Sequence, residues 1–162
     1  MVGRMRRSLR ALGATAVAAM VLTGCGMQVP ADPEGTLERI EGGVLRVGAT
    51  ENAPWVEVDD SGEPSGTEPA LVSDFAERHG ATIEWTAGSE ATLLDALDRG
   101  ELDLVLGGFV EDTPWTELGA ATRPYAETQT PDGTEKHVML VRMGENGFLV
   151  ALESFLDEEA DR

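Results

Sequence analysis

Carboxylate and indole side chains gather in one short stretch of the sequence, "LGGFVEDTPWTELG" at residues 106–119. Two glycines are followed by Glu111, Asp112 and Trp115, and the stretch has no basic residue, histidine or cysteine. Carboxylates attract cations by charge, and the face of an aromatic ring attracts them by about 0.5–2 kcal/mol. We therefore expect this stretch to prefer a cationic or neutral group over a carboxylate. The alternative is an acidic turn that faces only water.

Other kinds of chemistry find little support in the sequence. The two histidines, His79 and His137, lie far apart, with no cysteine or histidine at the spacing of metal ligands, and we predict both to be surface residues. No serine lies in a nucleophile elbow. Gly107 and Gly108 lack the lysine and the Ser/Thr of a phosphate-binding loop. We therefore predict no catalytic residue, no metal site and no cofactor.

The N-terminus has the pattern of an export signal. Four arginines between residues 4 and 10 precede a run of mostly small apolar residues at 11–22, which is too short for a membrane-spanning helix of ~20 residues. The segment "LTGC" at 22–25 resembles a bacterial lipobox, and Cys25 is the only cysteine in the chain. The resemblance implies cleavage before Cys25, its modification by acyl chains such as palmitate, and anchoring on the extracytoplasmic face of a cell membrane. The alternative is an ordinary signal peptide with a chance cysteine.

The predicted mature chain is strongly acidic. Cleavage after residue 24 removes four arginines and leaves 138 residues, which changes the formal net charge from −18 to −22. This charge excludes nucleic acid and anionic surfaces as partners that the protein binds through its own field. The length suits one domain with a substantial core. We divide the chain into a signal peptide at 1–24, a tether at 25–35 and one lobe at 36–160.

The elements that position the acidic stretch alternate between strands and helices. Short apolar runs rich in β-branched residues predict strands at 44–50, 82–87 and 102–108. Apolar side chains at helical spacing predict one helix from Pro69 to Gly80 and another from Ser89 to Gly100. This order favours an α/β fold with a mostly parallel sheet flanked by helices, in which ligands bind beyond the carboxyl ends of the strands.

The last part of the chain is predicted to close the domain. A polar connection at 126–136 leads to an apolar strand at 137–143. A final helix then carries a stripe of large apolar side chains, namely Phe148, Leu149, Leu152, Phe155 and Leu156.

Four segments between about residues 36 and 127 together resemble the family 3 extracellular solute-binding proteins, the receptors of ABC importers. They are "LERIEGGVLRVGATENAPW", "DDSGEPSGTEPALVSDFAERHGATIEW", "LLDALDRGELDLVLGGF" and "TRPYAET". The resemblance implies a periplasmic-binding-protein-like fold and a small solute as ligand.

The resemblance also implies roles for individual residues. Trp55 matches the aromatic residue that flanks the ligand, and Glu68 matches the acid that engages the ligand's amino group. Val110 stands where the family usually has a Ser or Thr, and Trp115 stands near the place of an arginine that clamps a carboxylate. The chain therefore departs from the family where amino acids are recognised. The predicted ligand-binding set is Trp55, Glu68, Gly108, Phe109, Glu111, Asp112, Thr113 and Trp115.

Three of these residues have alternatives that concern structure alone. Trp55 and Trp115 are the expected stacking pair, but each could instead pack on the edge of the lobe. Glu68 could equally be a helix N-terminal charge that the helix dipole favours.

Family members have two lobes with the solute between them, but this chain does not cross into a second lobe after "RPY". The segment "KHVMLVRMGENGFLVALESFL" instead resembles the family's last strand and closing helix. We therefore expect a single lobe and a non-enzymatic function, that of a lipid-anchored, transport-associated receptor for a small cationic or neutral solute. One alternative is an interaction module that docks on a membrane transporter or sensor. Another is an enzyme similar to the dehydratases of this fold.

Overall fold

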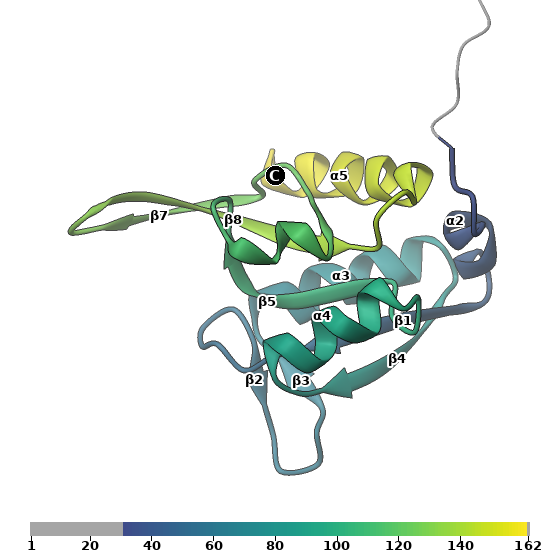
Figure 1. Ribbon diagram of the computed structural model, residues 1–162, viewed down its shortest axis with the longest axis horizontal. Helices are drawn as coiled ribbons and strands as arrows, with labels where there is room; N and C mark the ends of the chain where they lie inside the picture. The colour runs from purple at the N-terminus through teal and green to yellow at the C-terminus, as the bar shows by residue number, and fades with distance from the viewer. Residues whose placement is uncertain (1–30, 162) are drawn as a thin grey trace, which may run out of the picture.

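A six-stranded sheet forms the centre of the computed structural model, which describes residues 31–161 (Figure 1). The strand order is β4-β1-β5-β8-β6, and β7 pairs with the remaining part of β8. The bounds are β1 Val44–Ala49, β4 Thr82–Ala87, β5 Leu104–Val110, β6 Ala120–Ala121, β7 Ala126–Thr130 and β8 Gly133–Val141. β1 pairs in parallel with both β4 and β5, whereas β8 runs antiparallel to its three partners. The predicted α/β fold and its three parallel strands are confirmed.

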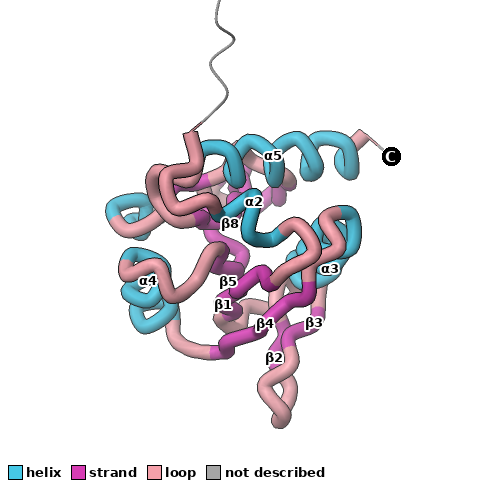
Figure 2. Tube along the Cα trace, turned by 90° about the vertical axis from the view of Figure 1, so that its right-hand side faces the viewer, coloured by secondary structure: helices cyan, strands magenta, loops and turns pink. Residues whose placement is uncertain are grey.

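Helices cover both faces of this sheet, with α3 and α4 on opposite sides (Figure 2). The helices α2 (Thr36–Ile40), α3 (Thr67–Arg78) and α5 (Asn146–Ala160) contribute side chains to one core cluster, together with β1. The helix α4 (Glu90–Asp98) and the 3-10 helix η1 (Pro114–Glu117) pack on a second cluster. The strand β5 is buried on both faces, which explains its continuous apolar sequence.

The predicted helix boundaries have clear local causes. The Ser89 hydroxyl caps α4 by accepting a hydrogen bond from the Thr92 backbone N–H at 3.4 Å. Gly80 follows α3 with a φ of 63°, a left-handed conformation that glycine adopts without cost. The predicted apolar stripe of the last helix is also confirmed, because Phe148, Leu152, Phe155 and Leu156 are all buried.

The polar segment at 126–136 is not a plain connection, so that prediction was wrong. It forms β7, a two-residue turn at 131–132 and the first part of β8, in a hairpin that projects from the body of the protein (Figure 1). The apolar strand predicted at 137–143 is the second part of β8. The hairpin escaped prediction because residues 126–136 are mostly polar and none of them is fully buried, so no apolar face imposes an alternation of apolar and polar residues on the sequence.

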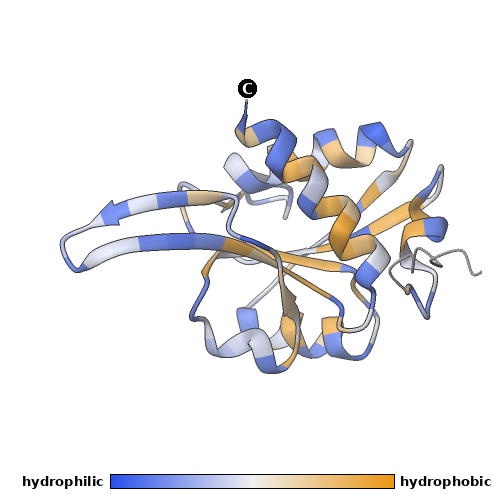
Figure 3. Ribbon diagram, turned by 90° about the horizontal axis from the view of Figure 1, so that it is seen from above, coloured by the Kyte–Doolittle hydropathy of each residue, from blue (hydrophilic) through white to orange (hydrophobic). Residues whose placement is uncertain are grey.

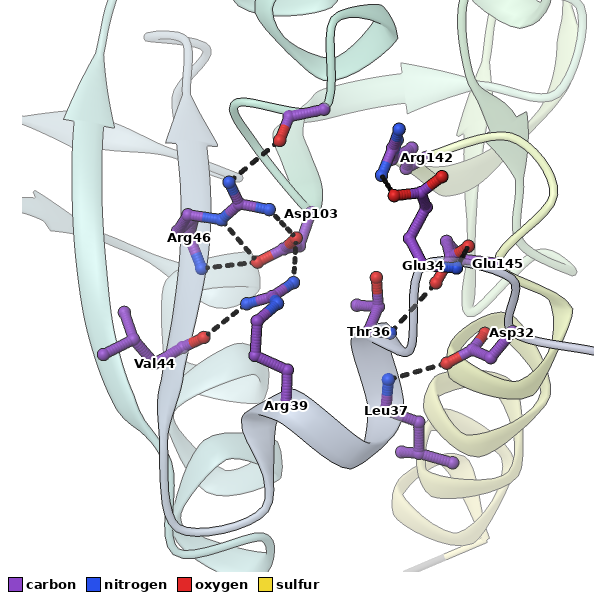
Figure 4. Close-up of polar contacts among 11 residues, drawn as sticks. Asp32, Glu34, Thr36, Leu37, Arg39, Val44, Arg46, Asp103, Arg142 and Glu145 are labelled. Carbon is purple, nitrogen blue, oxygen red and sulfur yellow. Dashed lines mark hydrogen bonds and ion pairs between the residues drawn. The ribbon is translucent and has the colours of Figure 1, made fainter.

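Two groups of polar contacts fasten the opposite edge of the lobe (Figure 4). The buried carboxylate of Asp103 lies 2.6 Å from a guanidinium nitrogen of Arg39 and 2.6 Å from one of Arg46. Burial alone would raise the pKa of Asp103, but hydrogen bonds from Arg46 and Arg39 hold it below its ordinary value. These contacts tie β5 to β1 and α2.

The second group involves the predicted tether. Asp32 accepts hydrogen bonds from Leu37 N–H (2.6 Å) and Phe148 N–H (3.0 Å), and therefore joins the first turns of α2 and α5. Glu145 accepts bonds from the backbone of Glu34 and Thr36, both at 3.0 Å. The carbonyl of Ala31 also accepts hydrogen bonds from the N–H groups of Asn146 (3.0 Å) and Gly147 (3.3 Å), so residues before the predicted boundary at 36 already contact the lobe.

The remaining strands, β2 (Glu57–Val58) and β3 (Pro64–Ser65), form a small antiparallel hairpin. In the turn that joins these two strands, Asp59 accepts hydrogen bonds from the backbone N–H groups of Ser61 and Glu63. Among residues 31–161, no helix has the length and apolar character needed to cross a membrane. The predicted signal peptide and Cys25 lie outside the described residues.

Candidate functional site

A buried carboxylate organises the carboxyl ends of the parallel strands. The side chain of Glu68, in the first turn of α3, is 0% exposed. Its Oε2 accepts hydrogen bonds from the backbone N–H of Gly107 (2.8 Å) and of Gly108 (3.0 Å) at the end of β5. Its Oε1 accepts a bond from the hydroxyl of Tyr125 at 2.6 Å. Both oxygens are therefore occupied by groups of the lobe itself.

Burial shifts the protonation of this pair. Desolvation raises the pKa of Glu68, and the hydrogen bonds from Tyr125, Gly108 and Gly107 only partly oppose it. The pKa of Tyr125 is raised by burial and by the neighbouring Glu68 carboxylate, so the phenol remains a hydrogen-bond donor.

Trp55 lies beside this carboxylate in an aromatic group. Its ring is 3.9 Å from the ring of His137 between centroids, with a tilt of 35°. The rings of Trp55 and Tyr125 form a T-shaped pair with centroids 6.1 Å apart. Gly108 has a φ of +60°, and a Cβ at that position would overlap the indole of Trp55. Only glycine therefore allows the end of β5 to lie against this ring. One face of the ring predicted to stack on a ligand is already covered by His137.

His137 was predicted to be a surface residue, and that prediction was wrong. It is only 3% exposed because β8 begins four residues earlier than predicted, which places His137 inside the sheet. One ring nitrogen lies 3.3 Å from the carbonyl oxygen of Gly108, and the other lies 3.0 Å from the hydroxyl of Thr128. His79 was also predicted at the surface, but it is half-buried. Its ring lies 4.5 Å from that of Phe75 between centroids, and its Nδ1 is 2.7 Å from the Glu41 carboxylate.

The acidic stretch continues from β5 into a second group of residues. Phe109 is 5% exposed and belongs to the core cluster beneath α4. Thr113 is 8% exposed, and its N–H donates to the carbonyl of Val110 at 2.9 Å. The indole N–H of Trp115 donates to the Glu90 carboxylate at 2.6 Å, and the ring packs against the same core cluster. Trp115 therefore lies with α4 and apart from the group of Trp55.

The exposed carboxylates of the stretch lie beside a pocket of about 470 Å³ at the base of the β7–β8 hairpin. One wall comes from the end of β5 and the other from β8. The Glu111 carboxylate is 3.7 Å from the Lys136 ammonium, and both side chains are well exposed. The lining residues are Val110, Glu111, Asp112, Thr134, Glu135 and Lys136. Three carboxylates and one ammonium make this pocket suited to a cation.

The predicted ligand-binding set thus separates into three places. Trp55, Glu68 and Gly108 form the buried group, and Phe109 and Trp115 pack at α4. Thr113 precedes η1, and Glu111 and Asp112 line the acidic pocket. The sequence analysis missed Tyr125, His137 and Asn52, whose side-chain amide donates to the carbonyl of Gly107 at 2.7 Å. The "RPY" segment was the one available signal for Tyr125. Within residues 31–161, no group of histidine, cysteine, aspartate or glutamate side chains is arranged to hold a metal ion.

Comparison with known proteins gives two short sequence matches. The chain is 39% identical over 70 residues to Membrane-bound lytic murein transglycosylase F 2 of Alkalilimnicola ehrlichii, which covers 43% of this chain and 16% of that protein. It is 36% identical over 88 residues to Membrane-bound lytic murein transglycosylase F of Aliivibrio fischeri. This second match covers 53% of this chain and 17% of that protein. The chain therefore spans about a sixth of the length of these curated relatives.

Solved structures match the fold more completely. A point mutant of the arginine-bound form of domain 1 from TmArgBP has a TM-score of 0.68 at 22% identity, covering 78% of this chain and 99% of that chain. An ancestral cationic amino acid solute-binding protein has a TM-score of 0.67 at 15% identity, covering 78% and 94%. The unliganded L-cystine solute receptor of Neisseria gonorrhoeae has a TM-score of 0.63 at 13% identity, covering 77% and 91%. At these identities the likeness concerns the fold alone.

A sequence model of one protein family, the bacterial extracellular solute-binding proteins, family 3, matches residues 45–159 of this chain. The matched residues run from β1 to the last turn of α5. This match includes every strand of the central sheet. The chain therefore belongs to family 3 of the bacterial extracellular solute-binding proteins.

Proposed function

We propose that this chain is a lipid-anchored, transport-associated solute-binding protein that holds a small cationic or neutral solute at the carboxyl ends of its parallel strands. The β7–β8 hairpin takes the place at which family members cross into a second lobe. One lobe supplies only half of a cleft, and small-molecule sites usually bury most of their ligand. Binding of a free solute is therefore weak unless a partner covers it.

The observation that carries this proposal is the acidic pocket at the base of the hairpin. Glu111 and Asp112 follow directly from β5, and Glu135 lies opposite them on β8. A solute carboxylate would meet this negative charge, while an amine would be attracted by it. Among the similar structures, domain 1 of TmArgBP is in its arginine-bound form, and another protein is an ancestral cationic amino acid solute-binding protein. Both agree with a cationic solute.

Tryptophan fluorescence of the full chain tests the solute preference. The titrants are L-arginine amide, which is cationic, and succinate, which is anionic. Trp85→Phe removes the indole on β4, far along the chain from the pocket, and leaves Trp55 and Trp115 as reporters. We expect saturable binding of the amide that weakens as salt is added, and none of succinate.

Neutralising the pocket gives the matched comparison. Glu111→Gln with Asp112→Asn should weaken amide binding by roughly tenfold, which corresponds to about 1.4 kcal/mol. Asp95→Asn with Asp98→Asn removes the same charge from α4 and should leave binding nearly unchanged. The solute preference would be refuted if succinate bound saturably and neither pair of substitutions changed its affinity.

Anchoring through Cys25 has a separate test. Metabolic labelling with a palmitate analogue should mark the full chain, which should sediment with membranes. Cys25→Ser should abolish the label and release the protein. Equal labelling and sedimentation of the Ser variant would refute the anchor and leave the solute preference untouched.

Two other functions follow from the same fold. The projecting hairpin favours an interaction module that docks on a membrane transporter or sensor, for which recovery of one stable membrane partner without solute is the test. An enzymatic role has less support. Among the described residues, Glu68 is the carboxyl group whose pKa is raised by burial, and it is fully enclosed by groups of the lobe.

A further inference from the structure

A free strand edge and the acidic pocket meet where β5 separates from β8. The pairing of β5 with β8 ends at Val110↔His137, and the N–H of Glu111 donates to the carbonyl of Lys136 at 2.8 Å. β8 begins at Gly133 and is paired over Gly133–His137 with β7 on its other side. Within residues 31–161, no strand covers the β5 side of Gly133–Glu135.

The backbone of Thr134 faces this open side. Residues of a strand turn their N–H and C=O groups alternately to the two sides. The carbonyl of Lys136 points to the β5 side, so the backbone of Thr134, two residues earlier, points there too. The hairpin holds Thr134 in place, since its hydroxyl accepts a hydrogen bond from the Gln129 side chain at 3.0 Å. A strand that continued the line of β5 could therefore form hydrogen bonds with the backbone N–H and C=O of Thr134.

The charge around this edge selects the occupant. The pocket beside Thr134 is lined by the carboxylates of Glu111, Asp112 and Glu135, and its Lys136 ammonium lies 3.7 Å from Glu111. The hairpin itself is hydrophilic over most of its length (Figure 3). A second copy of the chain would bring the same carboxylates and a formal net charge of −18. Repulsion therefore disfavours self-pairing at this edge.

We propose that this edge binds an extended basic segment of a partner protein, which adds to β8 beside Thr134 and places Lys or Arg side chains against Glu111, Asp112 and Glu135. The inference depends on the proposed function, because it assigns a partner class to the same cation-preferring pocket. Main-chain hydrogen bonds give affinity in such strand addition, and the side chains give specificity. The pocket wall distinguishes this edge from the outer edge of β7.

Three peptides with blocked termini distinguish binding through strand pairing from binding through charge alone. The first alternates lysine and valine, the second alternates glutamate and valine, and the third is the lysine peptide with every second backbone nitrogen methylated. Methylation removes the N–H donors of one edge and keeps the charge. By fluorescence anisotropy with the full chain, we expect the lysine peptide to bind, the methylated peptide to bind at least about tenfold more weakly, and the glutamate peptide not to bind.

Hydrogen exchange locates the contact. The amide of Thr134 should exchange more slowly with the lysine peptide present. Glu111→Gln, Asp112→Asn and Glu135→Gln together should weaken binding by at least about tenfold, because three charges are lost. The control Glu38→Gln, Asp95→Asn and Asp98→Asn removes the same charge elsewhere and should change binding little.

Equal binding of the methylated and unmethylated peptides, or no protection at Thr134, would overturn strand addition. If either result occurs while arginine amide still binds, the proposed function stands and the partner class is wrong. Dimerisation of the chain that competes with the lysine peptide would also overturn the inference, since the occupant would then be a second copy.

Discussion

Glu68 shows how one residue acquires its role from its surroundings. Its place in a family motif predicts contact with a ligand, but in the structure its two oxygens accept bonds from Gly107, Gly108 and Tyr125. Gly107 and Gly108 lie on β5, and Tyr125 lies just before β7. The Glu68 carboxylate therefore joins the first turn of α3 to both of these segments. Trp55 and His137 then stack on this frame.

Substitution of Glu68 should separate hydrogen bonding from charge. Glu68→Ala leaves two buried backbone N–H groups and a phenol without their acceptor, so we expect a loss of roughly 2–5 kcal/mol in the free energy of unfolding. Glu68→Gln keeps an acceptor for the glycine N–H groups and should cost much less. Urea unfolding measures both, and an equal loss in the two variants would contradict this role.

The same residue should give the protein a pH dependence of defined sign. Because the folded pKa of Glu68 is raised, the folded state holds the proton more tightly than the unfolded chain does. Its contribution is therefore fully present below the ordinary pKa of about 4.5 and is lost as pH rises through the folded value. The stability difference between wild type and Glu68→Gln, measured by urea unfolding across this range, should shift against the wild type as pH increases. A constant difference would show that the carboxyl group does not titrate in this way.

At the scale of elements, the β7–β8 hairpin and α5 contribute in opposite ways. The hairpin beyond Thr128 is polar and largely exposed, whereas α5 buries four large apolar side chains against α3 and the sheet. Burial of apolar surface supplies most of the stability of a domain. The hairpin is therefore available for contact with a partner, and α5 is required for the fold.

Shortening the hairpin should leave the domain folded. Replacement of residues 129–134 by Asn-Gly joins the strands through a tight turn. It keeps Thr128, which contacts His137. We expect the midpoint of thermal unfolding to change by only a few degrees, because few buried contacts are lost. Circular dichroism measures it, and loss of the cooperative transition would mean that the tip is structural. The shortened variant should also lose the binding of the lysine peptide.

Removal of α5 should unfold the domain. Deletion of residues 146–162 exposes partners of Phe148, Leu152, Phe155 and Leu156, each of which contributes about 1.5–3 kcal/mol when fully buried. This sum is comparable with the total stability of a typical domain, about 5–15 kcal/mol. A deletion variant that still melts cooperatively by circular dichroism would contradict the closing role of the helix.

At the scale of the whole molecule, the first described residues meet the start of the last helix at one edge of the lobe. Asp32 accepts hydrogen bonds from the N–H groups of Leu37 in α2 and Phe148 in α5. Glu145 accepts them from the backbone of Glu34 and Thr36, and Figure 4 shows the contacts at α2. The first and last helices are thus joined by carboxylates that accept backbone N–H groups. Part of the predicted tether belongs to the folded lobe.

This arrangement predicts where the folded unit starts. A fragment of residues 31–161 should unfold in one cooperative transition, and a fragment of 36–161 should be less stable by roughly 1–3 kcal/mol because it lacks Asp32 and Glu34. Asp32→Ala in the longer fragment should account for a large part of this loss. Equal urea midpoints for the two fragments would show that residues 31–35 act only as a tether.

The sequence by itself determined the alternation β1-α3-β4-α4-β5, the parallel pairing of β1, β4 and β5, and the apolar face of α5. Those features depend on local periodicity and on capping residues such as Ser89, which neighbouring residues reveal. Tertiary structure alone decided that Glu68 meets Gly107 and Gly108, about 40 residues along the chain, and that His137 is buried against Trp55. It also decided that a polar segment becomes a projecting hairpin. These contacts join residues that lie far apart in the sequence, on α3 and β5 in one case and on β8 and the Trp55 loop in the other. Their physical cause is the burial of polar groups that only the folded sheet brings together.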